Sequence, residues 1–164
     1  GAVHSVLETF GSVDVIVNAA RRSWHGPIAA PGESLDSLEE QFYLNVVAPA
    51  RLTALVADLS WRHSPETNRA RHRHVVNLSS TAGHILYPGQ GQGAYASAKA
   101  AVNMLTRHQA AELGAIGVRA NAIAPNTFPH IVSTSSVVRA ILDLDGSART
   151  GGILVIDSDG SSWI

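Results

Sequence analysis

The sequence predicts an α/β protein built around a parallel β-sheet, and three observations carry this prediction. Four short apolar runs have the composition of strands that are buried on both faces of a sheet. Segments with helical periodicity lie between these runs, so strands and helices alternate along the chain. Glycine and proline fall mainly between the segments, where the chain is expected to turn. Residues 1–164 are therefore predicted to form one domain.

The first half of the chain predicts a helix, a strand and a long second helix. Apolar residues recur at helical spacing over residues 3–10, and a glycine follows as a stop signal. Residues 13–20, VDVIVNAA, form a continuous β-branched run and are predicted to be a strand. A capping box formed by Asp36 and Glu39 opens a helix that runs through about Trp61, and Pro49 should kink it.

The second half predicts three more strands with helices between them. Residues 62–72 are the most loop-like stretch, and residues 73–80, RHVVNLSS, form the second buried-type strand. A glycine-rich loop over residues 81–94 leads into a helix that Gly114 ends. The last three elements are a strand at 117–124, a helix at 137–144 and a strand at 151–157.

Composition and charge exclude several classes of function. The net charge is −1 with His neutral, so no basic field draws the chain to nucleic acid or to an anionic membrane. The absence of cysteine excludes disulfides, thiolate metal sites and a cysteine nucleophile. The histidines show no paired helical spacing, so no metal site is predicted, and His72 and His74 are expected to be solvated. We find no apolar run of membrane-spanning length and no signal-peptide pattern at the start, and expect a cytoplasmic protein.

A tyrosine and the only lysine of the chain stand four positions apart in the segment GAYASAKAAVNML. Tyr95 and Lys99 are separated by one helical turn, so both side chains leave the same face of the predicted helix. A phenol held beside an ammonium group suggests proton chemistry. The alternative is a surface tyrosine and a solvated lysine whose spacing arises by chance.

Five motifs follow one another in a fixed order. They are D-V-I-V-N-A-A, V-N-L-S-S, Y-A-S-A-K, V-R-A-N-A-I-A-P and T-G-G-I-L-V-I-D-S-D-G, with Asn45 in a long helix after the first. In this series the chain resembles the short-chain dehydrogenase/reductase family over nearly its whole length. The resemblance implies an incomplete Rossmann-like doubly wound parallel sheet, made of the family's strands 4-5-6-7 with flanking helices. It also implies hydride transfer between NAD or NADP and a carbonyl or secondary alcohol substrate.

The resemblance further implies a role for each catalytic candidate. Tyr95 would be the general acid/base, with its phenolate form favoured by the positive charges of Lys99 and of the cofactor. Lys99 would also hold the nicotinamide ribose. Ser80 would donate a hydrogen bond to the substrate carbonyl oxygen, with Ser79 as the rival for this role. Asn45 would hold a water molecule that links Lys99 to solvent, and the alternative is an asparagine that simply points into solvent.

Two strand ends are expected to contribute to cofactor binding. Ligands of open α/β sheets sit at the carboxyl edge, where Asn18, Ala19 and Ala20 end the first strand. The resemblance places this segment along the adenosine side of the cofactor, although strand-end turn chemistry also explains Asn18. The predicted cofactor-binding set is Asn18, Ala19, Ala20, Tyr95, Lys99, Pro125 and Asn126.

The chain also departs from the family pattern. The glycine-rich loop T-G-x-x-x-G-x-G, which wraps the cofactor pyrophosphate in the family, has no match here. The run G-Q-G-Q-G at 89–93 follows a proline-containing loop, and we interpret it as an active-site loop instead. Arg21 stands where the family usually has a glycine. Only 151 − 125 = 26 positions separate Pro125 from Gly151, so the substrate-covering lid is expected to be short. The family's cofactor-contacting threonine is not clearly placed, and Thr127 is the candidate to replace it.

The absence of the family's first three strands leads to predictions about partners. Residues 13–18 become an edge strand that is apolar on both faces, which invites pairing with a preceding segment or a partner chain. The resemblance also implies a homo-oligomer packed through two helices, with Ala100, Ala101 and Ala110 as small contact residues. Ordinary packing of the helix on its own sheet is the alternative explanation for these alanines. Two alternatives to an enzyme stay open. One is a non-catalytic subunit, and the other is a truncated fragment that acts by pairing with another chain.

Overall fold

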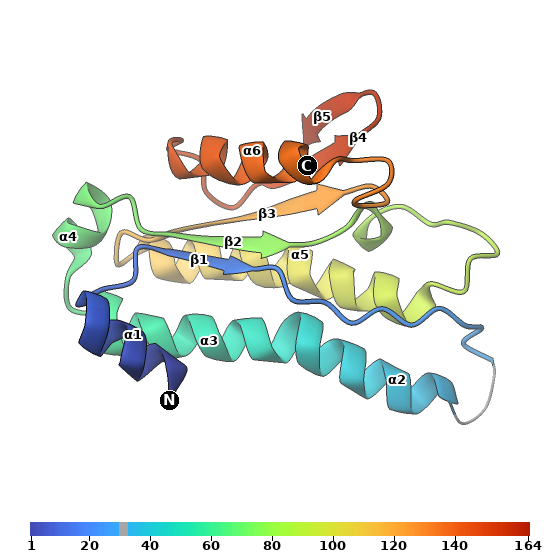
Figure 1. Cartoon of the computed structure of the whole chain (residues 1–164), viewed down its shortest axis with the longest axis horizontal. Helices are drawn as coiled ribbons and strands as arrows, with labels where there is room; N and C mark the ends of the chain where they lie inside the picture. The colour runs from blue at the N-terminus through green and yellow to red at the C-terminus, as the bar shows by residue number, and fades with distance from the viewer. Residues whose placement is uncertain (30–32) are drawn as a thin grey trace.

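The computed structural model describes residues 1–29 and 33–164 and shows a five-stranded sheet with helices on both faces (Figure 1). The strands lie side by side in chain order: β1 (Val15–Asn18), β2 (His74–Leu78), β3 (Arg119–Pro125), β4 (Ile153–Asp157) and β5 (Gly160–Trp163). The first four are parallel, which confirms the predicted sheet and its strand order. The fifth strand is antiparallel to β4 and was not predicted from the sequence.

The two faces of the sheet carry separate parts of the hydrophobic core. Three helices that cover one face are α1 (Ala2–Phe10), α3 (Ala48–Val56) and α5 (Gly93–Gly114). Against them pack Ile16, Trp61 and Val75. Helix α6 (Thr134–Asp145) covers the other face, where Val76 and Ile123 are buried.

Strand β1 forms one edge of the sheet, as the sequence predicts. Ile16 points into the core and is 6% exposed, whereas Val15 and Val17 alternate to the opposite face and are 38% and 42% exposed. An open strand edge beside two exposed valines is a surface on which another β-segment can pair.

The long helix begins three residues earlier than predicted and contains two π-helical turns. It runs through α2 (Glu33–Phe42), η1 (Tyr43–Val47), α3 and η2 (Ala57–Trp61). The side chain of Asp36, on which the capping box depends, lies outside the described side chains.

Pro49 lies in the first turn of α3, just after the π-helical turn η1. Proline has no N–H to donate to the carbonyl oxygen of Asn45, four residues earlier. Within the turn, the N–H of Ala48 bonds to the carbonyl of Tyr43, five residues back. Proline and π-helical turns are both recognised sites of helix kinks, so the kink expected at Pro49 coincides with this turn.

The hydropathy of this long helix corrects one expectation. Among the described residues, Ser37–Trp61 is long and apolar enough to cross a membrane by length and composition, with a mean hydropathy of 1.3. The prediction that no run reaches this length was therefore wrong on these two criteria. In the structure the helix lies against α5 and buries the polar side chains of Gln41, Asn45 and Thr53.

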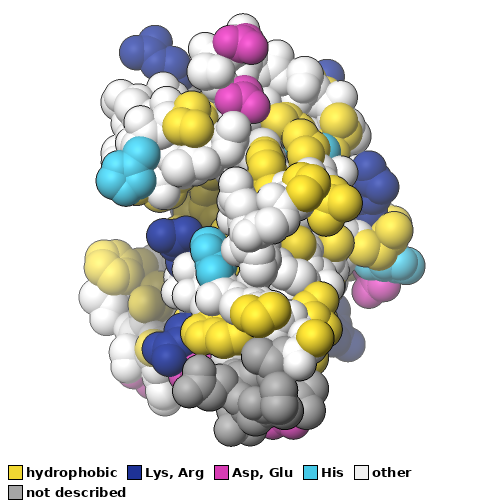
Figure 2. Space-filling view, turned by 90° about the vertical axis from the view of Figure 1, so that its right-hand side faces the viewer, with side chains coloured by type: hydrophobic (Ala, Val, Ile, Leu, Met, Phe, Trp, Pro, Cys, Tyr) yellow, Lys and Arg dark blue, Asp and Glu magenta, His cyan; other side chains and the backbone are white. Residues whose placement is uncertain are grey.

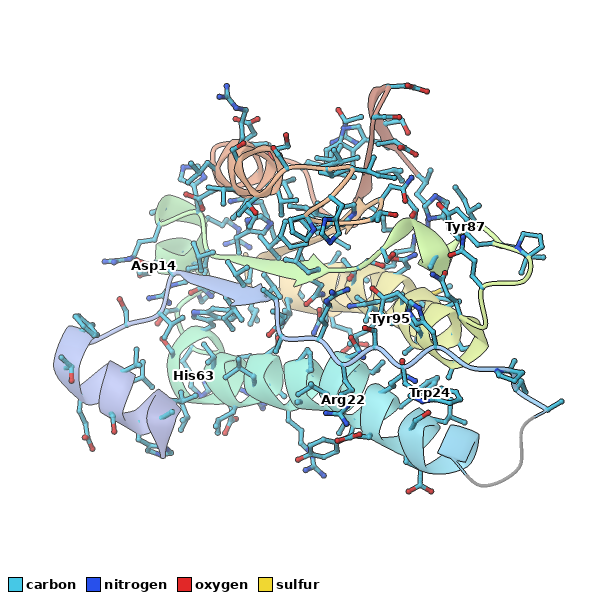
Figure 3. The ribbon with its side chains drawn as sticks, turned by 45° about the vertical axis from the view of Figure 1, so that its right-hand side comes forward. Asp14, Arg22, Trp24, His63, Tyr87 and Tyr95 are labelled. Carbon is cyan, nitrogen blue, oxygen red and sulfur yellow. The ribbon has the colours of Figure 1, made fainter. Side chains whose placement is uncertain are left out.

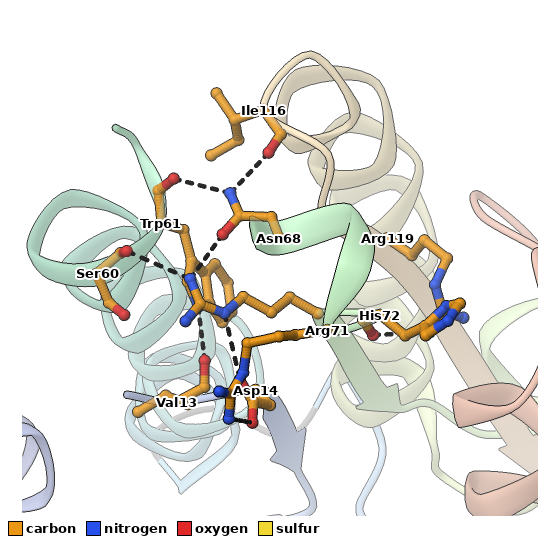
Figure 4. Close-up of polar contacts among 10 residues, drawn as sticks. Val13, Asp14, Ser60, Trp61, Asn68, Arg71, His72, Ile116 and Arg119 are labelled. Carbon is orange, nitrogen blue, oxygen red and sulfur yellow. Dashed lines mark hydrogen bonds and ion pairs between the residues drawn. The ribbon is translucent and has the colours of Figure 1, made fainter. Parts of the chain in front are cut away.

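Residues 62–72 contain a short helix, α4 (Pro65–Ala70), where the sequence predicted a loop. Pro65 fits the first helical turn because no N–H is needed there. The fully buried Asn68 fixes the segment by donating to the carbonyls of Trp61 and Ile116, at 2.8 and 2.7 Å (Figure 4). It accepts from Arg73 at 2.6 Å. Ile116 lies 48 positions away in the sequence, so the polar composition of the segment did not reveal the contact that orders it.

His74 is buried in β2, which contradicts the expectation of a solvated side chain. The amide oxygen of Asn121 accepts from the Gly152 N–H at 3.1 Å, so its nitrogen faces the histidine. That nitrogen lies 3.1 Å from Nε2 of His74, and Nε2 must therefore accept, which places the proton on Nδ1. Burial, followed by the charge of Arg119, lowers the pKa of His74 to about 4. No group of three or more candidate metal ligands occurs among the described residues.

We expect the protein to lose stability as the pH falls from about 6.5 to about 4. The unfolded chain binds a proton on His74 in this window and the folded protein does not, so protonation favours unfolding. A depression of this size corresponds to about 3 kcal/mol. Urea unfolding at pH 7 and pH 4.5 should show a smaller acid loss for His74→Gln than for the wild type. His72→Gln, at an exposed neighbouring position, is the control, and an equal acid loss in all three proteins would contradict this account.

Candidate active site

A cleft of about 500 Å³ opens at the carboxyl edge of the parallel strands. Figure 2 looks onto this edge, where basic and histidine side chains lie at a hollow. Six of the predicted site residues line the cleft, although they come from four separate parts of the chain. They are Ala19, Ser80, Tyr95, Lys99, Pro125 and Asn126.

Tyr95 and Lys99 lie together on the face of α5 that borders the cleft. The Lys99 ammonium is 5.7 Å from the centre of the Tyr95 ring, and the two residues are 2% and 7% exposed, respectively. The surface-pair alternative is therefore excluded. Nζ of Lys99 donates to the carbonyl of Leu78 at 2.7 Å. Burial is the main cause that lowers the pKa of Lys99 to about 8, and the positive charge of Arg21 adds to it.

The position of Lys99 is fixed by a close approach of η3 (Thr81–Gly83) to helix α5. A Cβ atom at Gly83 would lie 2.8 Å from the carbonyl carbon of Lys99, so only glycine fits there without a shift of the backbone. The hydroxyl of Ser79 donates to the carbonyl oxygen of Lys99 at 3.2 Å. These two contacts connect the end of β2 directly to the helical turn that carries the lysine.

Ser79 and Ser80 are the two candidates for the hydrogen-bond donor to the substrate oxygen, and their hydroxyl groups bind different partners. Ser79 uses its proton on the backbone of Lys99 and is 5% exposed. Ser80 accepts from the N–H of Ala82 at 3.2 Å as the N-cap of η3, so its own proton is available to a group in the cleft. The geometry thus favours Ser80 as the donor to a ligand.

Asn45 is buried in η1 and does not line the cleft. Its side-chain nitrogen donates to the carbonyls of Arg22 and Gln41, each at 2.8 Å. Its side-chain oxygen is buried without a partner among the described residues. The alternative of an asparagine pointing into solvent is therefore wrong.

Asn18 and Ala20 of the predicted cofactor-binding set do not line the cleft. The side-chain nitrogen of Asn18 instead donates to the side-chain oxygen of Asn77 at 2.8 Å, across the β1–β2 pair. This bond joins Asn18 to its register partner in β2 and is a cross-strand contact, not the strand-end turn expected from the sequence. Asn126 lines the cleft, and its side-chain nitrogen donates to Asp157 at 3.1 Å.

The sequence did not predict that His25, in the segment that follows β1, lies at the cleft. The ring of His25 lies 5.9 Å from the ring of Tyr95, and both His25 and Arg21 line the cleft. The N–H of Gly26 donates to the carbonyl of Gly91 at 2.8 Å, which ties the segment to the glycine-rich loop. In Figure 3 the segment runs between the sheet and the long helix, past the labelled Tyr95. An irregular polar stretch has no periodicity that could have revealed this placement.

The glycine-rich loop lies at the cleft, as its interpretation as an active-site loop requires. Gln90 and Gln92 from this loop line the cleft, together with Tyr87. Val137 and Ile141 of α6 supply apolar lining to the same cleft. The short lid region therefore still contributes one wall.

The sequence is similar to a known protein family and to several characterised enzymes. A family model described as short chain dehydrogenase matches residues 1–138. Cyclohexanol dehydrogenase of Rhodococcus sp. (strain TK6) is 31% identical over 125 residues, which are 76% of this chain and 44% of that protein. Carbonyl reductase (NADPH) 2 of Sus scrofa is 33% identical over 124 residues, which are 76% of this chain and 47% of that protein. The matched segments thus make up less than half of these relatives.

Solved structures show the same fold. A short chain dehydrogenase from Mycobacterium avium superposes with a TM-score of 0.80 at 26% identity, over 99% of this chain and 58% of that one. A 4-hydroxyisoleucine dehydrogenase complexed with NADH and succinate gives a TM-score of 0.78 at 26% identity, over 96% of this chain and 74% of that one.

Proposed function

The chain belongs to the short-chain dehydrogenase/reductase family, and on that premise we propose that its cleft is an oxidoreductase active site. The reaction is hydride transfer between NAD(H) or NADP(H) and a carbonyl or secondary alcohol substrate. The observation that carries the proposal is the buried pair of Tyr95 and Lys99, which faces a cleft that Ser80 also lines.

Each side chain has a distinct task in this proposal. A bound nicotinamide supplies the hydride chemistry. Ser80 donates a hydrogen bond to the substrate oxygen, where negative charge develops during reduction. Tyr95 gives its phenolic proton to the same oxygen, and in the oxidation direction it takes that proton back. The positive charge of Lys99 stabilises the phenolate left behind.

The surroundings of Lys99 fit a nicotinamide cofactor. The ammonium group has three protons, and only the bond to the Leu78 carbonyl is formed within the described chain. The remaining protons are available to the ribose hydroxyls of a cofactor. Ala19, Pro125 and Asn126 line the same cleft and would lie along the bound molecule. The proposal covers NAD and NADP equally.

Asn45 has the properties needed to hold a water molecule for proton exchange. Its side-chain oxygen is buried without a described partner, and Pro49 provides no helical donor for its backbone carbonyl. Helix α5 packs against the π-helical turn that contains it. We assign to Asn45 a water that renews the proton of Lys99 from solvent.

The proposal includes a partner for the exposed edge of β1 and assembly into a homo-oligomer in the cytoplasm. Val15 and Val17 support the first part because they remain exposed beside an open strand edge. Ala100 is exposed on α5 and fits the predicted oligomer contact, whereas Ala110 is buried in this chain's own core. Ala110 is thus withdrawn from the set of contact residues.

Titration with NADH and NADPH, followed by nicotinamide fluorescence, tests the proposed function. We expect saturable binding of at least one of the two cofactors. Lys99→Met should weaken that binding by roughly tenfold or more, because it removes charge-assisted hydrogen bonds. Circular dichroism checks that the variant is folded. Absence of binding at millimolar cofactor with a folded wild type would contradict the proposal and favour the non-catalytic alternative.

A further inference from the structure

The cleft contains one positive charge that the proposed hydride chemistry does not use, the guanidinium of Arg21. His25, Lys99 and His130 line the same cleft. No aspartate or glutamate is among its described lining residues. A molecule bound in this cleft therefore meets cationic and neutral groups, without a carboxylate to balance them.

Arg21 lines the cleft with a charged group for which the described chain provides no partner. No ion pair or hydrogen bond of its guanidinium occurs within the described chain, although the side chain borders the cleft. Its neighbour Arg22 behaves differently, because it pairs with Glu40 at 3.0 Å and does not line the cleft. Two adjacent arginines thus have separate surroundings.

The proximity of Arg21 to Lys99 adds an energetic argument. The two positive charges repel each other strongly enough that Arg21 contributes to the lowered pKa of Lys99. An anionic group bound between them relieves this repulsion and gains charge-assisted hydrogen bonds. The planar guanidinium is suited to a carboxylate or phosphate, since it can offer two parallel N–H donors.

We propose that Arg21 binds an anionic oxygen group, a carboxylate or a phosphate, of a molecule that occupies the cleft. Val137 and Ile141 line the cleft as well, so the ligand combines an anionic end with an apolar part. This inference rests on the proposed function only for the identity of the cleft as the active site. The anion belongs either to an oxo acid substrate or to a phosphate of the cofactor, and the two sources can be separated by experiment.

Calorimetric titration of the full chain without cofactor tests the proposal. The probes are 4-methyl-2-oxopentanoate, its uncharged amide, and inorganic phosphate. We expect at least one anion to bind, and Arg21→Gln to weaken it roughly tenfold or more. Arg21→Lys, which keeps the charge but loses the planar fork, should weaken it less. Arg22→Gln is the matched control and should change the dissociation constant less than twofold.

The pattern of losses identifies the source of the anion. If Arg21→Gln loses affinity for the oxo acid but not for phosphate, and no protein binds the amide, the anion belongs to the substrate. If Arg21→Gln loses affinity for phosphate but not for the oxo acid, and also binds NADH or NADPH more weakly, the anion belongs to the cofactor. Either result supports the proposal.

Several outcomes would overturn it. The first is that the folded wild type binds no anion, and the second is that it binds the amide tightly. The others are that Arg21→Gln binds the anion as tightly as the wild type, or that Arg22→Gln loses as much anion affinity as Arg21→Gln. The nicotinamide titration keeps this test separate from that of the proposed function. Cofactor binding without Arg21-dependent anion binding removes only the present inference. Arg21-dependent anion binding without cofactor binding removes only the proposed hydride chemistry.

Discussion

Tyr95→Phe is expected to lower turnover by about 10²- to 10⁴-fold, the range that general acid–base catalysis contributes. The substitution removes only the phenolic hydroxyl and keeps the buried ring beside His25 and Lys99. Cofactor affinity should therefore change by no more than a few-fold. Steady-state kinetics with a substrate found by screening carbonyl compounds gives the first quantity, and nicotinamide fluorescence gives the second.

The control for this variant is Tyr43→Phe. Tyr43 is 55% exposed on the long helix, where the guanidinium of Arg51 lies 5.9 Å from the centre of its ring, and it does not line the cleft. Removal of its hydroxyl should leave turnover within about twofold of the wild-type value, as expected for a surface change. Unchanged turnover in Tyr95→Phe would remove Tyr95 from the proposed role, whatever the behaviour of the control.

Trp61→Ala is expected to lower the free energy of unfolding by about 3–5 kcal/mol. Trp61 is fully buried, packs with Ile16 and Val56, and donates its indole N–H to the carbonyl of Val13 at 2.7 Å. The substitution leaves a cavity and an unpaired carbonyl. Urea unfolding at pH 7 measures the loss.

Two further variants sharpen this prediction. Trp61→Phe keeps most of the volume and removes the hydrogen bond, so it should cost less than Trp61→Ala. Leu59→Ala changes a side chain that is 42% exposed in the same helical turn and should cost about 1 kcal/mol or less. A loss below about 1 kcal/mol for Trp61→Ala would show that this part of the core is packed differently.

The regular elements were accessible from the sequence because each leaves a local pattern. The four parallel strands are continuous apolar runs, and Gly11 ends α1 in the left-handed conformation that its sequence position suggests. β5 left no such signal, because it is a short, largely polar strand held by pairing with β4 through a tight turn. Helix α4 likewise depends on Asn68, which bonds to the carbonyl of Ile116, 48 positions away in the sequence.

The candidate site was predictable where spacing or motif order placed its residues. Tyr95 and Lys99 share one helix face, and Ser80 follows a strand at the carboxyl edge. The role of Asn18 was not accessible, because its bond to Asn77 depends on the register of two strands that are far apart in sequence. The burial of His74 was hidden for a similar reason, since its partner Asn121 lies on another strand.

The most direct measurement of the central claim is a crystal structure of the chain grown with NADH or NADPH. We expect the nicotinamide ring to lie in the cleft between Ser80 and Tyr95, with the ribose hydroxyls bound to the ammonium of Lys99. A cofactor bound elsewhere on the protein, or bound in the cleft with its nicotinamide away from Tyr95, would contradict the account.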